Sequence, residues 1–339
     1  SKPIKKTEYI PIDELIANNN LGEVTSRTIQ RDIKSLEESN LLTRSGSGRS
    51  TKYKSDIKQL SALTISTETL EEILNTERNP VFYNFENLDT ISNFTFGDEQ
   101  QNKLSLVTND FKSRRNTFVD ELKKKELERI IVEISWKSSK MEGNTYSLLE
   151  TENLLKYGIA PDRRNEFETQ MILGHKKALD FVIGNSSEFL KTIRPSAIIE
   201  THKILTENLG ITPNIRTNSV AITASSYEPL GNQFQITEEL NRLCEKLSTI
   251  NNGYKQALIA FSFLAYLQPF NDGNKRTARI VSNAILLAHD LIPISFRSLD
   301  ISKYVTSLIL YYEFGIFGNL KDVLIDQIEY TNNNYFKTE

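Results

Sequence analysis

The chain has 339 residues, of which 38% are hydrophobic and 25% are charged, as is usual for globular proteins. No apolar run approaches the roughly 20 residues that cross a membrane, and the first residues lack the apolar core of a signal peptide. A single cysteine, Cys244, excludes an internal disulfide, and with only three histidines it argues against a zinc site. These features favour a cytoplasmic protein of two or three domains.

Charge is unevenly distributed along the chain. Residues 1–60 carry eleven Lys/Arg and eight Asp/Glu, whereas the remaining residues carry thirty and thirty-six. The first segment is therefore net positive on a net negative body. Such a basic segment favours a local anionic partner.

The basic segment, residues 1–60, resembles a winged helix-turn-helix in the order of its elements. Apolar spacing predicts a short helix over 11–18 and a second over 25–36, with Ser26 as N-cap and Ile29, Ile33 and Leu36 inward. Basic strands at 41–44 and 51–54, joined by a Gly/Ser tip, predict a hairpin. Duplex DNA would then be contacted by Arg27, Thr28, Gln30, Arg31 and Lys34 of the helix and Arg44, Arg49, Lys52 and Lys54 of the hairpin. The alternative is a solvated basic helix on a small helical cap.

The rest of the chain reads as mainly α-helical. Residues 61–100 are expected to connect the two parts and to pack on their neighbours, because five aromatics are too many to leave in water. A short helix is predicted within them, at 67–75. Further helices are predicted at 103–125, 126–141, 147–157, 165–184, 195–209, 254–266, 302–313 and 319–330. His175 and His202 read as packing or surface residues, His289 as a surface or capping residue, and Cys244 as buried.

Two features stand out between these helices. The helix over 126–141 ends at Glu142-Gly143-Asn144, where Gly143 is a natural terminating residue. Without a partner, Glu142 would be a solvated glutamate. Alternation within residues 214–230 predicts a β-hairpin, whose free edge can bind an extended peptide by strand addition. The alternative is a packed surface hairpin.

The richest stretch is residues 268–279, Gln-Pro-Phe-Asn-Asp-Gly-Asn-Lys-Arg-Thr-Ala-Arg, between two apolar helices. A turn with Asp, Gly and Asn at the start of a helix suits a phosphate chain and a metal. Gln268, the first residue of the stretch, stands where a reaction at this site would need a base to accept a proton. An amide does not titrate and cannot accept it.

This stretch resembles the signature of the Fic family, His-Pro-Phe-x-(Asp/Glu)-Gly-Asn-(Gly/Lys)-Arg-x-x-Arg, and the similarity extends over about residues 100–330. The resemblance implies an all-α domain, over residues 101–335, with a hairpin flap. It also implies AMP transfer from ATP to a Ser, Thr or Tyr hydroxyl of a target protein, which could be the chain itself. Asp272 would hold Mg²⁺, and the nucleotide would be bound by Gly273, Asn274, Lys275, Arg276, Arg279 and Tyr304. The target would lie against Val220, Ala221, Ile222 and Thr223 of the flap.

Gln268 departs from the signature, because the family uses a histidine there as general base. Loss of a general base typically costs ~10²–10⁴ in rate, so the resemblance implies a chain that is inactive or strongly impaired, by deliberate change or natural variation. Lys275 is shared with the phosphotransferase branch, the Doc toxins, which lack the final arginine. Arg279 therefore favours AMP transfer.

Residues 138–144, Ser-Ser-Lys-Met-Glu-Gly-Asn, resemble the family's inhibitory motif, (Ser/Thr)-x-x-x-Glu-(Gly/Asn). The resemblance implies that the helix over 126–142 is inhibitory through Ser138, Glu142 and Gly143. Glu142 would pair with Arg279 and exclude the γ-phosphate. In some relatives this glutamate aligns a water that removes AMP, so de-AMPylation is an alternative. A further alternative is a non-enzymatic, nucleotide-sensing regulator of DNA binding. Oligomerisation is left open.

Overall fold

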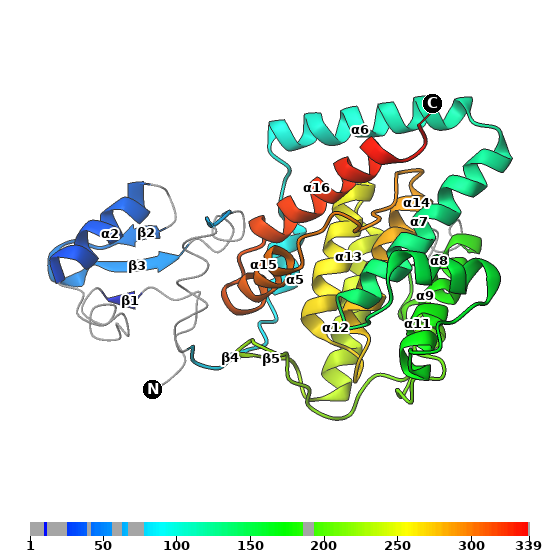
Figure 1. The fold of residues 1–339 in the computed structure, drawn as a ribbon. Helices are drawn as coiled ribbons and strands as arrows, with labels where there is room; N and C mark the ends of the chain where they lie inside the picture. The colour runs from blue at the N-terminus through cyan, green and yellow to red at the C-terminus, as the bar shows by residue number, and fades with distance from the viewer. Residues whose placement is uncertain are drawn as a thin grey trace.

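The computed structural model describes residues 10–11, 26–38, 42–55, 63–66, 78–185 and 193–337. Over these ranges the chain forms a small N-terminal α/β unit and a larger helical body (Figure 1). The helix predicted over 67–75 lies outside the described residues. So does the helix predicted over 11–18, except for Pro11, which is in a strand.

The N-terminal unit contains the predicted helix and hairpin. Its elements are β1 (Ile10–Pro11), α2 (Ser26–Glu38), β2 (Leu42–Ser45), a 3-10 turn at Gly48–Ser50, and β3 (Lys52–Ser55). The three strands form an antiparallel sheet in the order β1-β3-β2. Ile33 and Tyr53 are buried, but Leu36, which was expected to face inward, is 38% exposed. The small sheet covers only part of the apolar face of α2.

The described parts of the connecting segment are packed against the body, but two of its five aromatic residues, Phe82 and Phe85, are 62% and 46% exposed, contrary to the prediction. Leu63 and Ile65 contact Leu310 and Ile316. The Asn319 side chain accepts a hydrogen bond from the Ile65 N–H at 2.9 Å and donates to the Ile65 carbonyl at 2.8 Å. Further on, β4 (Val81–Phe82) pairs in parallel with β5 (Tyr227–Glu228).

The body is built around α13 (Gly253–Leu267), in which every residue except Lys255 is buried. A helix that is apolar on all sides belongs in the centre of a domain. Around it lie α5 (Asn87–Ser92), α6 (Asp98–Thr117), α7 (Asp120–Lys140), α8 (Leu148–Tyr157), α9 (Glu166–Gly184), α11 (Pro195–Leu205), α12 (Gln233–Ser248), α14 (Asn274–Ala288), α15 (Ile301–Phe314) and α16 (Gly318–Asn334). The motif of residues 268–279 spans the loop between α13 and α14 and the start of α14, and these two helices pack side by side. None of the helices described here is long and apolar enough to cross a membrane.

The break between α6 and α7 differs from the prediction. The sequence pattern places it at residues 125–126, whereas α6 ends at Thr117 and Phe118 and Val119 are extended. Asp120 and Glu121 then begin α7, where acidic side chains favour a helix N-terminus. Since no Gly or Pro marks this break, apolar spacing alone does not reveal it.

The predicted β-hairpin within residues 214–230 is wrong. Residues 217–226 form an irregular loop, and β5 pairs with β4 instead of with a neighbouring strand. The backbone of this loop is held by other parts of the chain. The Ala224 carbonyl accepts from Arg78 at 2.9 Å, and the Ser226 N–H donates to Glu313 at 2.8 Å. These contacts replace the cross-strand bonds that a hairpin would need.

Candidate active site

The loop of residues 268–273 is closed by the side chain of Asn274, the first residue of α14. Its Oδ1 accepts from the Phe270 N–H and its Nδ2 donates to the Phe270 carbonyl, both at 2.8 Å. Gly273 has φ +79°, and a Cβ there would lie 3.1 Å from Thr206 Cγ2, so the turn requires glycine. The first N–H groups of α14 have no partner within the helix and can bind an anion.

His202 supports this loop from α11. Its ring stacks on Phe270 at 3.7 Å between centroids, and its Nε2 lies 2.9 Å from the Asp272 carbonyl, to which it donates. Burial lowers the pKa of His202, so the ring is neutral. The sequence prediction of a packing histidine is therefore confirmed, and the packing partner is the motif itself.

Gln268 ends α13 in a left-handed conformation, with φ 51° and ψ 59°, which is uncommon for a residue other than glycine. Its side chain is 8% exposed, and Nε2 donates to the Ala265 carbonyl at 2.6 Å. The Gln268 carbonyl accepts from Nε of Arg216 at 2.6 Å. The position of the expected base is thus rigidly held.

Arg216 is a residue that the sequence did not single out. It is 1% exposed, and it links the motif to the 217–226 loop through the Gln268 carbonyl and, at 2.7 Å, the Asn218 carbonyl. Burial lowers its pKa. A lone arginine between two irregular segments gives no sequence signal, because its partners are carbonyl groups.

Arg276 is buried at 1% exposure with unused donors. Its Nη2 lies 3.2 Å from Oδ2 of Asp272, while Nε and Nη1 have no hydrogen-bond partner. Burial lowers its pKa. Since buried donors normally have acceptors, this guanidinium is arranged to receive oxygen atoms of an anion.

Arg279, in contrast, uses all of its nitrogens. Nε donates to Ser138 Oγ at 2.7 Å, Nη1 to the Tyr304 hydroxyl at 3.2 Å, and Nη2 to Oε1 of Glu142 at 2.8 Å. The side chain is fully buried. α7, α14 and α15 thus meet at one cation, and the predicted residues Ser138, Glu142, Arg279 and Tyr304 are brought together.

Glu142 has a second partner, since its Oε2 lies 3.1 Å from Nζ of Lys275. Burial alone would raise its pKa, but the charges of Arg279 and Lys275 outweigh burial and lower the pKa to about 2. An ionised carboxylate therefore occupies the place in which two of the predicted phosphate ligands meet. Gly143, with φ +91°, follows it in the turn after α7, which ends at Lys140, one residue before the predicted end.

Asp272 is the predicted metal ligand. Its side chain is 62% exposed, and Oδ1 accepts from the Gly273 N–H at 2.6 Å. No group of three or more His, Cys, Asp or Glu side chains that could hold a metal occurs in the described part of the chain. One accessible carboxylate beside a phosphate site still fits Mg²⁺, which takes one or two carboxylates together with substrate phosphates.

The predicted flap and DNA-contact residues lie elsewhere. In the 217–226 loop Ala221 and Thr223 are exposed, Val220 is half-buried, and Ile222 packs against the core. In the N-terminal unit the exposed side chains are Arg27, Gln30, Arg31, Lys34, Arg44 and Lys52, and Lys34 lies 3.7 Å from Glu38. The side chains of Thr28 and Arg49 lie outside the described ones. Both surfaces are accessible to a partner.

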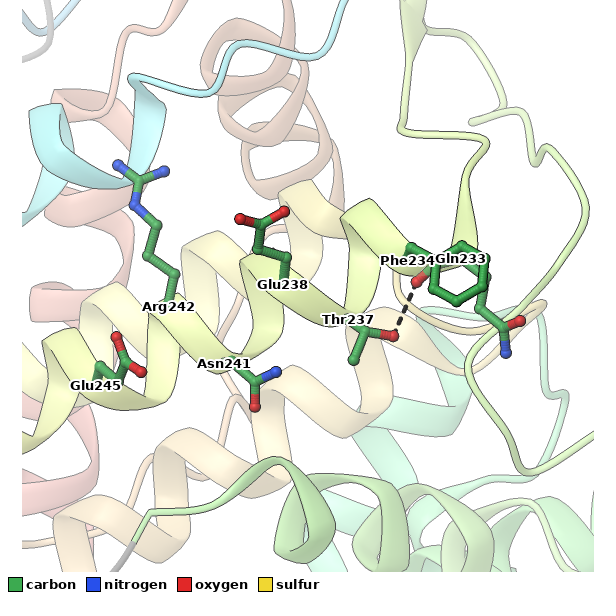
Figure 2. Close-up of a pocket in the computed structure, with 7 residues that line it drawn as sticks. All are labelled: Gln233, Phe234, Thr237, Glu238, Asn241, Arg242 and Glu245. Atoms are coloured by element: carbon green, nitrogen blue, oxygen red, sulfur yellow. Dashed lines mark hydrogen bonds between the residues drawn. The ribbon is translucent and has the colours of Figure 1, made fainter.

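A separate hollow lies on the outer face of α12 (Figure 2). Its side chains include Phe234, which is 83% exposed, together with Glu238 and Arg242 one and two turns further along. None of the residues that line it belongs to the 268–279 motif. The hollow is therefore not part of the site formed by the motif.

The chain is similar in sequence and in fold to known proteins. Residues 192–286 match the family model described as Fic/DOC family. Protein adenylyltransferase Fic of Nematostella vectensis is 28% identical over 171 residues, 49% of this chain and 40% of that protein. Its namesake in Aedes aegypti is 26% identical over 254 residues, 72% of this chain and 47% of that protein. This chain thus spans less than half the length of either relative.

A crystal structure of a Fic domain containing signaling protein from Bacteroides thetaiotaomicron superposes with a TM-score of 0.58. The two chains are 18% identical, and the match covers 68% of this chain and 94% of the other. The fold of the helical body is therefore that of Fic domain proteins, and residues 192–286 are similar to the Fic/DOC family model.

Proposed function

We propose that this chain is a protein AMP-transferase that is held inactive by Glu142 and lacks its general base at Gln268. The observation that carries the proposal is the buried arginine pair. Arg276 has two buried nitrogens without a hydrogen-bond partner, and Nη2 of Arg279 donates to Glu142. Two buried guanidiniums three residues apart at a helix N-terminus suit the phosphates of a nucleotide. The relatives named protein adenylyltransferase support ATP as the nucleotide.

In the reaction, the oxygen of a target hydroxyl attacks the α-phosphorus of ATP, the bond to the β-phosphate breaks, and pyrophosphate leaves. Arg276 and the first N–H groups of α14 bind the phosphate oxygens and orient the chain of phosphates. Asp272 would hold a Mg²⁺ ion, which when bound neutralises charge on the phosphates. The hydroxyl proton must go to a base at position 268, where the Gln268 amide cannot take it.

Glu142 acts as the brake. It engages Nη2 of Arg279 and Nζ of Lys275, two cations that would otherwise face the terminal phosphate. An ionised carboxylate there repels that phosphate as well as removing its ligands. ATP then binds in an unreactive position until Glu142 moves away.

The test uses the double variant Gln268→His, Glu142→Gly with Mg²⁺ and ATP labelled in either the α- or the γ-phosphate. AMP transfer places the α-label, but no γ-label, on the chain itself or on proteins of an extract. Transfer of the γ-label alone would show a phosphotransferase. Transfer of neither label would overturn the transferase proposal.

A second candidate is a non-enzymatic, nucleotide-sensing regulator of DNA binding. Gln268 favours it, because it removes the base while the phosphate site is kept. The exposed basic side chains of α2 and of the β2–β3 hairpin would supply the contact to duplex DNA. This candidate predicts DNA binding that changes with ATP, and labelling that does not appear even in the double variant.

A further inference from the structure

His175 is a buried group that the proposed reaction does not use. It lies on α9, which packs against α7, α11 and α14, and it is 0% exposed. The preceding residue, Gly174, allows α9 to approach α11 closely, because a Cβ there would lie 2.4 Å from the Leu205 carbonyl oxygen. The helix is therefore set at a depth that carries the imidazole to the end of α7.

The imidazole contacts the same serine as Arg279. His175 Nε2 lies 2.6 Å from Ser138 Oγ, and Arg279 Nε donates to that oxygen at 2.7 Å. Arginine can only donate, so the Ser138 oxygen accepts from it and keeps its own hydrogen for another acceptor. Burial, reinforced by the charges of Arg279 and Arg276, holds the pKa of His175 well below its usual range. In the tautomer that carries its proton on Nδ1, the neutral ring offers Nε2 as that acceptor.

We propose that His175 is a positioning residue for the brake formed by Glu142, and this rests on the proposed function. By holding the Ser138 hydroxyl, His175 turns the serine oxygen toward Nε of Arg279. The guanidinium is a planar fork, so fixing Nε also fixes Nη2, which donates to Glu142 at 2.8 Å. Three helices are thereby joined in one line of hydrogen bonds, from His175 through Ser138 and Arg279 to Glu142.

The experiment measures labelling from α-labelled ATP in the whole 339-residue chain carrying Gln268→His. His175→Phe keeps a ring but removes both nitrogens, whereas His175→Gln places an amide near the position of Nε2. A hydrogen bond of ordinary strength corresponds to about a fivefold change in population. Relative to the chain with Gln268→His alone, we expect about fivefold more labelling when His175→Phe is added. Adding His175→Gln should leave labelling near the level of that reference chain.

A double-mutant cycle tests whether His175 acts through Ser138. Ser138→Ala should raise labelling at least as much as His175→Phe does. The combined variant should label no faster than Ser138→Ala alone. Additive increases would show that His175 acts by another route and would overturn the inference. His289→Asn is the matched control, because His289 contacts Gln256 at 2.7 Å outside this network; it should leave labelling unchanged.

Two further comparisons separate the possible failures. If Gln268→His with Glu142→Gly does not label, the proposed function itself fails. If that chain labels but His175→Phe stays at the level of Gln268→His alone, only the role of His175 is overturned. Should His175→Phe unfold at the assay temperature, His175→Asn replaces it, since its amide reaches the Nδ1 position but not Nε2. His175→Asn should then raise labelling above the level of Gln268→His alone. Labelling that stays at that level would contradict the proposal.

Discussion

Glu142 Oε1 lies 2.8 Å from Arg279 Nη2, although the two residues are 137 positions apart in the chain. The carboxylate comes from the turn that ends α7, and the guanidinium comes from the buried side of α14. This pair places the chain's own anion in a site whose other features suit a phosphate. An arginine–carboxylate pair of this kind is directional and is broken only when a competing anion or a conformational change replaces the carboxylate.

The first prediction concerns the pH dependence of this pair. The pKa of Glu142 is lowered to about 2, below the value of 4.5 for an unperturbed glutamate. Its stabilisation is therefore fully present above about pH 4.5 and is lost as the pH falls toward 2. At pH 7, Glu142→Gln should lower the free energy of unfolding by an amount on the order of 3 kcal/mol. Urea unfolding of both chains should show this difference shrinking by about 1.4 kcal/mol per unit below pH 4.5.

Glu121→Gln is the control for that series. Glu121 lies 3.9 Å from Lys125 with both side chains exposed, so its replacement, which also removes one charge from the first turn of α7, should change the free energy of unfolding by no more than about 1 kcal/mol at any of these pH values. A Glu142→Gln difference that stays constant from pH 7 to pH 3, or that disappears by pH 6, would contradict the assignment.

The second prediction separates stability from binding at Arg276. This guanidinium is buried with two unused nitrogens, so Arg276→Gln should leave thermal stability unchanged or raise it. The same change removes charged hydrogen bonds to the nucleotide and should weaken ATP affinity about 10- to 100-fold. Calorimetric titration with MgATP in the Glu142→Gly background measures this. Arg163→Gln, on the surface, should bind as the unaltered chain does; equal affinities for both variants would remove Arg276 from the site.

The third prediction concerns the loop of residues 217–226. Glu313, which is 2% exposed, accepts from Ser225 Oγ at 2.7 Å and from the Ser226 N–H at 2.8 Å, and it lies 2.8 Å from Nε of Arg78. Glu313→Gln weakens these charged interactions, so amides of the loop should exchange with deuterium about tenfold faster. Glu238→Gln, on the outer face of α12 (Figure 2), is the control. Unchanged exchange with Glu313→Gln would mean that other parts of the chain hold the loop.

The fourth prediction concerns the N-terminal unit. If it binds duplex DNA, the affinity of the full chain should fall steeply with salt, because neutralising phosphates releases counterions. Changing Arg44 and Lys52 to alanine should reduce the logarithmic salt slope by about 0.9 for each phosphate that is no longer neutralised. Lys176→Ala and Lys177→Ala on the helical body serve as charge-matched controls. Binding that is absent at low salt, or insensitive to salt, would count against a DNA interface.

The sequence allowed the helices and the 268–279 motif to be predicted, because apolar spacing and local turn residues carry that information. Ser138, Glu142 and Arg279 were grouped through the family resemblance, and the structure brings them together. The hairpin was wrong, since the alternation of residues 218–223 does not say which backbone groups will serve as partners. Arg216 and His175 could not be assigned roles from sequence, because their partners are distant carbonyl or hydroxyl groups.

The same argument applies to Lys275. The motif places Lys275 in the phosphate cradle. In the structure its Nζ lies 3.1 Å from Oε2 of Glu142, a residue more than a hundred positions earlier in the chain, just after α7. Whether a cation in such a loop faces a ligand or an internal carboxylate depends on tertiary packing. No local sequence pattern indicates which of the two the cation contacts.

The most direct test of the account is the rate of labelling by α-labelled ATP and Mg²⁺ in four chains: the unaltered chain, Gln268→His, Glu142→Gly, and the double variant. Histidine is among the residues that tolerate the left-handed backbone of position 268, so the change should not disturb the fold. We expect rapid labelling only in the double variant, slower labelling with Gln268→His, and rates ~10²–10⁴ below the double variant in the two chains that keep Gln268. A double variant that labels no faster than Glu142→Gly alone, or a Gln268→His chain that labels as fast as the double variant, would contradict it.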